Sequence, residues 1–444
     1  MIAARFSRIG FILAAAGSAV GLGNIWKFPY ITGENGGGAF VLIYLMAITF
    51  IGLSIFIAEV AMGRLSRSDA VSAYESLAPK PGPWKFAGFT LLTGILILTY
   101  YPIVIGWVFK YIWVAATHLP TTVEASGAAF GEMLTQDASG QIFYFTLAFL
   151  CTFLIVSMGV KKGIEKLNLV LMPLLVIILL LLFCYAITLD GFDDALKFLF
   201  VADFSKVRAT SVMEAVGHAF FTLSLGMCCI MTYSASLPEN ANIVRSSFTV
   251  AVLDTAIALV AGIIIFSLIF SFNAEPGQGP GLLFISLPPL FAQLGMAGTL
   301  GATLFFVAVA FAGVTSCISI VEPGVLYLTN RLNWSRPLAL LAIGGVAYSL
   351  GLLALLSNIE HTGDSLKLFG MGAFDLFDFT SSSILLPLGG ILVAVFVGYV
   401  MEKQKLEHLL LPYMHPRLFH CWYFSIRYLA PAGVVAMMIN KLAA

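Results

Sequence analysis

The segment that decides the fold is Gly17-Ser18-Ala19-Val20-Gly21-Leu22-Gly23-Asn24-Ile25-Trp26-Lys27-Phe28-Pro29, which lies inside an apolar run near the start of the chain. It carries three glycines, an asparagine, a lysine and a proline where a membrane-spanning helix is expected. Lipid cannot hydrogen-bond a free backbone N–H or C=O, so irregular backbone at this depth must be buried in protein or line a cavity. A helix broken here therefore predicts a polar binding site in the middle of a membrane, as in a transporter.

The composition of the rest of the chain also indicates a membrane protein. Of the 444 residues, 60% are hydrophobic and 10% are charged, whereas soluble domains average about 25% charged residues. Apolar runs of about 20 residues divide the chain into roughly eleven predicted helices. They lie near residues 10–35, 38–63, 86–117, 141–159, 167–189, 212–235, 242–272, 297–328, 337–356, 376–400 and 420–440. The formal net charge of zero gives no reason to expect a nucleic-acid partner.

The distribution of charge predicts the orientation. Basic residues gather in the loops at 64–85 and 161–166, whereas the loop at 119–140 contains acidic residues and no Lys or Arg. Short loops rich in Lys and Arg face the cytoplasm. We therefore expect a multi-pass protein of a bacterial inner membrane with a cytoplasmic N-terminus.

A second interrupted apolar segment occurs at Phe220-Phe221-Thr222-Leu223-Ser224-Leu225-Gly226-Met227. Predicted helices one and six are thus both broken, five helices apart. Broken segments at corresponding positions of two halves indicate an inverted repeat with its binding site at the repeat interface. We expect one domain over residues 1–444, with repeats near 8–190 and 210–402 and an extra helix at 417–440.

Oxygen-bearing groups recur at these breaks and on two further helices. In a membrane, sodium is held by unwound backbone carbonyls together with side-chain oxygens. An Asp at bilayer depth costs about 2.5–3.5 kcal/mol, so Asp254 predicts an ion or proton path; an Asp that pairs with backbone at a helix end is the structural alternative. The other candidates are the carbonyls of residues 17–20 and the side chains of Asn24, Thr222, Ser224, Thr315 and Ser316.

Together these segments resemble the neurotransmitter:sodium symporter family. The matching stretches, which span essentially the whole chain, are residues 10–29, 34–40, 59–64, 220–226 and 312–316. The resemblance implies an all-α integral membrane protein with a LeuT-like 5+5 inverted-repeat bundle, in which helices one and six are broken at mid-membrane. It further implies a short bacterial member with about eleven helices.

The activity implied by the resemblance is sodium-coupled symport of a hydrophobic or aromatic α-amino acid into the cell by alternating access. The expected small molecules are a neutral amino acid and two sodium ions, with the bilayer as surroundings and a monomer or weak dimer as the assembly. The sequence holds no His-Glu-x-x-His or other catalytic motif that would indicate an enzyme. A proton-coupled carrier that uses Asp254 or Glu322, and an amino-acid-sensing receptor on the same fold, remain alternatives.

The resemblance also assigns roles to individual residues. The first sodium ion would bind Ala19, Asn24, Thr222 and Asp254, and the second would bind Gly17, Val20, Ala312, Thr315 and Ser316. The substrate would contact Ala19, Leu22, Gly23, Ile97, Tyr101, Phe221, Thr222, Ser224, Met227, Ser316 and Ile320. Tyr101 and Phe221 would form a lid, and Lys27 with Asp378 an outer charged gate.

Some positions depart from the pattern of the family. Lys27 replaces the usual Arg, and an ammonium cannot form the bidentate fork of a guanidinium. Asp254 replaces an Asn found in many members, while Ala258 stands at the chloride-linked position, so we expect transport that does not need chloride. Ile2 and Asn330 stand where the usual inner ion pair is expected, which leaves the inner gate unassigned.

Overall fold

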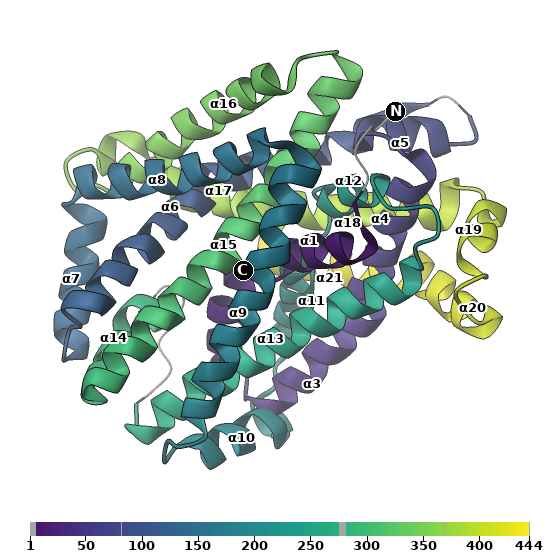
Figure 1. Ribbon diagram of the computed structural model, residues 1–444. Coiled ribbons are helices and arrows are strands. Elements are labelled where there is room, and N and C mark those ends of the chain that lie inside the picture. Colours follow the sequence, from purple (N-terminus) through teal and green to yellow (C-terminus); the bar gives the residue numbers. More distant parts are fainter. Residues whose placement is uncertain (1–5, 81, 275–280, 368, 444) are drawn as a thin grey trace.

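The computed structural model describes residues 6–80, 82–274, 281–367 and 369–443, and it forms a bundle of helices with no strand in those ranges (Figure 1). Ile2, one of the two positions aligned with the usual inner gate, lies outside the described residues. Nine helices in these ranges are long and apolar enough to span a membrane, and counting one bent pair as a span gives ten. The broken sixth segment adds two shorter helices, so a helix lies at every predicted span.

The bounds of the remaining elements are as follows. The spans contain α3 (Gly38–Ala47), α4 (Leu53–Ser66), α6 (Leu91–Thr117), α8 (Ala138–Ser157), α9 (Lys166–Ala186), α13 (Ile243–Ser271), α15 (Gly295–Arg331), α16 (Arg336–Leu356), α17 (Ala373–Phe379), α18 (Leu386–Val395), α20 (Pro416–Phe424) and α21 (Ala430–Ala443). Shorter connecting helices are α5 (Ala70–Leu77), α7 (Val123–Thr135), α10 (Phe192–Phe200), α14 (Leu287–Gln293) and α19 (Lys403–Leu410). Turns of 3-10 or π geometry occupy Ile48–Gly52, Pro83–Thr90, Val160–Glu165, Phe204–Lys206, Leu282–Ser286, Gly363–Leu366, Thr380–Leu385, Phe396–Val400 and Ser425–Leu429.

The first span breaks where the glycines predict it. Helix α1 (Arg8–Ala19) is capped at its N-terminus by Ser7, whose side chain accepts the Gly10 N–H. It ends at Val20, where the backbone becomes extended with φ −72° and ψ 100°. The chain resumes as a π-helical turn at Gly23–Lys27 and then as α2 (Phe28–Glu34), at an angle of 48° to α1. The end of α1 leaves carbonyl groups without helical partners.

The sixth span breaks between α11 (Ala209–Thr222) and α12 (Cys229–Ala235). The backbone turns left-handed at Ser224, Gly226 and Cys228, with φ values of 54°, 81° and 65°. A Cβ on Gly226 would lie 2.3 Å from the Leu386 carbonyl oxygen, so only glycine fits there. The Glu59 side chain accepts the Gly226 N–H at 2.8 Å and so caps the unwound backbone. Both predicted breaks are therefore present.

Helix α1 lies in the interior of the bundle, where it packs against α9, α12, α13 and α15 (Figure 1). Its residues from Ala14 to Ala19 are all buried, and burial continues through the break to Ile25. The additional helix α21 packs against α11 and α18. The two broken spans are thus enclosed by continuous helices, which satisfies the requirement that irregular backbone stay away from lipid.

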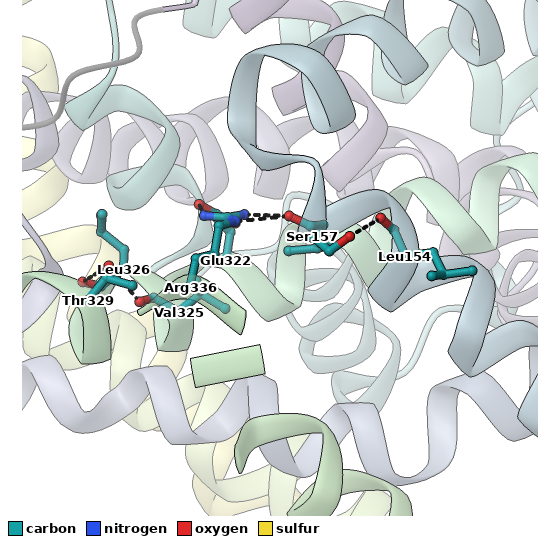
Figure 2. A network of polar contacts seen from close by, with 8 residues as sticks. Leu154, Ser157, Glu322, Val325, Leu326, Thr329 and Arg336 are labelled. Carbon is teal, nitrogen blue, oxygen red and sulfur yellow. Dashed lines mark hydrogen bonds and ion pairs between the residues drawn. The ribbon is translucent and has the colours of Figure 1, made fainter. Parts of the chain in front are cut away.

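A partly buried ion pair, with Glu322 buried and Arg336 at the edge, joins α8, α15 and α16 (Figure 2). The Arg336 guanidinium at the start of α16 donates to both oxygens of Glu322 in α15, at 3.0 and 2.6 Å. It also donates to the Val156 carbonyl oxygen of α8, at 3.0 and 2.7 Å. This bidentate geometry is the strong form of an Arg–carboxylate contact. Glu322 is therefore engaged with a cation.

Candidate functional site

A small buried cavity of about 30 Å³ lies between the two helix breaks. The first break contributes polar backbone, and α6, the sixth segment and α15 contribute side chains. Its lining residues are Ser18, Ala19, Gly21, Gly23, Ile97, Tyr101, Phe221, Thr222, Ser224, Met227, Ser316, Ile320 and Leu386. Every residue expected around the substrate therefore lines this cavity, with the exception of Leu22.

Leu22 instead lines a second cavity of about 260 Å³ next to the first. Its backbone N–H donates to the Tyr101 hydroxyl at 3.2 Å, so it still contacts the wall of the inner cavity. Tyr101 and Phe221 line both cavities and separate them. Their expected role as a lid stays a prediction.

Lys27 and Asp378 both line the larger cavity, but no ion pair within 4 Å joins them in the described structure. The Lys27 ammonium lies instead 4.6 Å from the centroid of the Phe221 ring. A cation over an aromatic face is attracted by the ring quadrupole. The two residues of the expected charged gate therefore do not form an ion pair in this structure. The lysine contacts the Phe221 ring instead.

Two of the residues expected around the first sodium ion, Asn24 and Thr222, converge on a third, Asp254 of α13. The Asn24 amide donates to Asp254 Oδ1 at 2.7 Å and to the Asp254 carbonyl oxygen at 3.0 Å. Thr222 donates its hydroxyl to the same Oδ1 at 2.9 Å. The other carboxylate oxygen, Oδ2, is buried and has no hydrogen-bond partner in the described part of the chain. Since Asp254 is fully buried, this oxygen is suited to a cation.

The residues expected around the second sodium ion lie where α1 ends against α15. Ser316 Oγ lies 3.3 Å from the Gly17 carbonyl oxygen and 3.5 Å from that of Val20. Thr315 Oγ1 lies 3.0 Å from the Ala312 carbonyl oxygen, one turn earlier in α15. Ser316 thus brings one hydroxyl of α15 to two carbonyl oxygens of the first break, whereas the Thr315 hydroxyl bonds to carbonyl oxygens of its own helix, at Phe311 and Ala312. Such groups are the ligands that sodium takes in membrane transporters.

Gly21 keeps the inner cavity open at its polar end. A Cβ at this position would lie 2.7 Å from Ser316 Oγ and 2.9 Å from the Tyr101 hydroxyl oxygen. Any larger residue would therefore displace one of these hydroxyls or fill the space between them. The absence of a side chain at residue 21 is a geometric requirement of the site.

The sequence reasoning missed Ser18 and Leu386 as lining residues. Ser18 lies within the first break, and its carbonyl oxygen accepts the Ser224 hydroxyl at 2.7 Å. Its position between Gly17 and Ala19 is a local signal that could have identified it. Leu386 begins α18, far along the chain, and reaches the cavity only because it packs on Gly226. No local pattern marks it.

A closed helical bundle with two broken spans around a buried, oxygen-lined cavity defines the class of secondary transporters. The sequence profile of the sodium:neurotransmitter symporter family matches residues 4–127 and 133–444. The chain belongs to this family. It is accordingly a sodium-dependent multi-pass membrane transporter and not an enzyme.

Similarities to individual proteins support the assignment to this family. The chain is 35% identical to a sodium-dependent transporter of Bacillus subtilis, YhdH, over 98% of this chain and 97% of the relative. It is 31% identical to a sodium-dependent transporter of Haemophilus influenzae over 98% and 97% of the two chains. The structure also resembles the crystal structure of MhsT in complex with L-phenylalanine, with a TM-score of 0.89. The two sequences are 38% identical, and the match covers 99% of each chain. The LeuT-like fold expected from the sequence is therefore confirmed.

Proposed function

We propose that this protein carries a hydrophobic or aromatic α-amino acid into the cell together with sodium, by alternating access and without chloride. The observation that carries this proposal is the composition of the inner cavity. Its polar end is formed by the break at Gly21 and Gly23, and its opposite wall by apolar side chains: Ile97, Phe221, Met227 and Ile320. The solved complex of MhsT with L-phenylalanine supports an aromatic substrate.

The proposed orientation of the substrate follows from this polarity. Its carboxylate faces the backbone N–H groups after the break and the Tyr101 hydroxyl, because helix N-termini favour anions. Its amine faces the backbone of Ala19 and the lining residues Phe221 and Ser224. The apolar wall would strip water from a charged side chain without replacing it, which disfavours charged amino acids.

Two sodium ions are the proposed coupling cargo. The first is held by Ala19, Asn24, Thr222, Asp254 and the substrate carboxylate, and the unpartnered Asp254 Oδ2 supports this assignment. The second is held by Gly17, Val20, Ala312, Thr315 and Ser316, and the approach of the Ser316 hydroxyl to the Gly17 and Val20 carbonyl oxygens supports it. The carboxylate of Asp254 provides the negative charge near the first ion, so no chloride ion is needed.

The outer closure of the site is assigned to four residues. Tyr101 and Phe221 form the lid over the substrate, and Lys27 and Asp378 form the charged gate above it. The shared lining of the two cavities supports the lid. Contact of the Lys27 ammonium with the Phe221 ring supports a connection between gate and lid.

The surroundings of the transporter are proposed from the sequence. Its N-terminus lies in the cytoplasm of a bacterial cell, and its helices cross the inner membrane. Residues 8–190 and 210–402 form the two inverted repeats, 417–440 an additional helix, and the working unit is a monomer or weak dimer. The basic loops at 64–85 and 161–166 support this orientation.

A proton-coupled carrier is the main competing function, since Asp254 or Glu322 could hold a proton. The ion pair of Glu322 with Arg336 disfavours Glu322 in that role. The decisive experiment measures binding of labelled leucine, phenylalanine, tyrosine and tryptophan to the purified protein, in sodium and in potassium. Binding that requires sodium supports the proposal, whereas equal binding in both salts contradicts it. Uptake into proteoliposomes then separates a transporter from a sensor that binds without transport.

A further inference from the structure

The surface of α9 that faces α1 holds a buried polar atom that the two sodium sets do not use. Asn168 is 1% exposed, and its Oδ1 has no hydrogen-bond partner in the described ranges. Its Nδ2 donates to the Ile164 carbonyl oxygen at 2.9 Å, one turn earlier. This bond fixes the amide plane and leaves Oδ1 directed at α1.

The position of Oδ1 next to α1 is defined by Gly17. A Cβ on Gly17 would lie 2.0 Å from Asn168 Oδ1 and 3.2 Å from Thr315 Cβ. Asn168 and Thr315 therefore meet the same face of Gly17 from two different helices. Gly17 and Thr315 both belong to the set proposed for the second sodium ion, so the free amide oxygen lies immediately beside that set.

A second unpartnered oxygen lies along the same seam between α1 and the start of α9. Glu165 is buried, and its Oε1 accepts both the N–H and the hydroxyl of Ser7. Its Oε2 has no partner in the described structure. Gly10, which is two helical turns before Gly17 on the same face of α1, packs against the Glu165 carboxylate. Unpartnered oxygens therefore extend from the second sodium set toward the Ser7 end of the bundle.

Packing alone gives no reason for this arrangement. A buried amide oxygen without a partner costs free energy, and the described residues offer this oxygen no hydrogen-bond donor. A leucine of similar size would fill the space without that cost. An amide oxygen is, however, a suitable ligand for a hard cation.

We propose that Asn168 Oδ1 forms an additional, transient sodium position on the α9 side of Gly17. A sodium ion that moves between the second sodium set and the Ser7 end of the bundle passes Asn168. At that point it exchanges one oxygen ligand for another and does not have to cross an apolar contact. This inference rests on the proposed function, because it needs a sodium ion at the second set. It adds a residue that controls how fast that ion enters and leaves.

The test compares sodium dissociation rates with sodium affinity in the purified full-length protein. Dissociation of radioactive sodium after rapid dilution gives the rate, and the sodium dependence of labelled phenylalanine binding gives the midpoint. The variants are Asn168→Leu, which removes the oxygen, and Asn168→Gln, which retains a neutral amide oxygen. Met172→Leu, one turn further along α9 and also buried, is the matched packing control.

We expect Asn168→Leu to slow sodium dissociation about tenfold, the scale on which neighbouring groups alter metal binding, with a midpoint close to that of the wild type. Asn168→Gln and Met172→Leu should leave the rate near the wild-type value. Equal rates in Asn168→Leu and Met172→Leu would overturn the inference, as would equal slowing in Asn168→Leu and Asn168→Gln. If Asn168→Leu does not fold, Asn168→Ala serves in its place. Loss of sodium dependence in the wild type would instead show that the proposed function fails.

Discussion

Asn24 and Asp254 are in direct contact at the centre of the molecule, with the Asn24 amide nitrogen 2.7 Å from one Asp254 carboxylate oxygen. Thr222 donates to the same oxygen from the other broken span. One acid on a continuous helix therefore receives a hydrogen bond from each of the two breaks. The geometry of the first ion set depends on the presence and the charge of this acid.

Asp254→Asn should weaken sodium binding while keeping the shape of the site. The amide can still accept the Thr222 hydroxyl, but it removes the only formal negative charge among the protein groups of the first set. We expect the sodium midpoint for amino-acid binding to rise about tenfold or more. Ser247→Ala is the control, because this buried hydroxyl on the same helix bonds, within the described residues, only to the Ile243 carbonyl oxygen one turn earlier. An unchanged midpoint in Asp254→Asn would remove Asp254 from the ion site.

Replacement of chloride by gluconate should leave amino-acid uptake unchanged at constant sodium. The reason is that the Asp254 carboxylate already supplies a negative charge beside the first ion set, while Ala258 offers no anion ligand. The measurement is the initial rate of uptake into proteoliposomes in the two salts. A collapse of uptake in gluconate would contradict chloride independence.

Gly21→Ala should abolish high-affinity amino-acid binding, with at least about a tenfold loss. The added methyl group would lie 2.7 Å from Ser316 Oγ and 2.9 Å from the Tyr101 hydroxyl oxygen, inside the room for the substrate. Gly345→Ala is the matched control, because a Cβ there meets nothing within 4 Å. Binding of labelled phenylalanine to both variants tests this, and normal binding to Gly21→Ala would contradict the placement of the substrate.

Lys27→Met should accelerate release of the substrate. Loss of the cation over the Phe221 ring removes about 0.5–2 kcal/mol of attraction, which corresponds to roughly a two- to thirtyfold faster dissociation. Lys27→Arg keeps a cation and should remain close to the wild type. Asp378→Asn should have the smaller effect, since Asp378 forms no ion pair with Lys27 in the described structure. If Asp378→Asn accelerated substrate release more than Lys27→Met does, the Lys27–Asp378 pair, and not the contact with Phe221, would be the main gate.

Arg336→Met should destabilise the folded protein strongly. It leaves the buried Glu322 carboxylate without its cation, and breaking a buried pair on one side typically costs about 3–5 kcal/mol. The double variant Glu322→Gln with Arg336→Met should recover most of this loss. Thermal unfolding in detergent measures both. If the single variant is as stable as the wild type, Glu322 does not need a cation and can serve as a proton site.

The sequence was sufficient to predict the helices and both breaks, because membrane burial leaves a strong local signal. Each expected span coincides with a helix, and the glycines of residues 17–23 mark the first interruption directly. Short amphipathic connections such as α7 and α10 were not predicted. Their apolar residues are too few to resemble a span.

Contacts between distant segments were harder to predict. Leu386 reaches the cavity because Gly226 allows a close approach of two backbones, which is a tertiary relationship with no local pattern. The family pattern placed Lys27 opposite Asp378, yet the lysine lies over Phe221. A long, flexible side chain in a wide cavity has several partners within reach, and residue type does not choose among them.

The guanidinium of Arg336 bonds simultaneously to the acid of α15 and to the terminal carbonyl region of α8. The consecutive helices α15 and α16 are thereby joined at one point to α8, which lies far earlier in the chain, and the three form a frame. Among the described residues, the interruptions of the broken spans form no ion pair with these three helices, and the first interruption contacts α15 through the Ser316 hydroxyl. Conformational exchange between the two faces of the membrane should then be a movement of the interrupted spans within a stationary frame, so that cross-linking α8 to α16 would preserve transport.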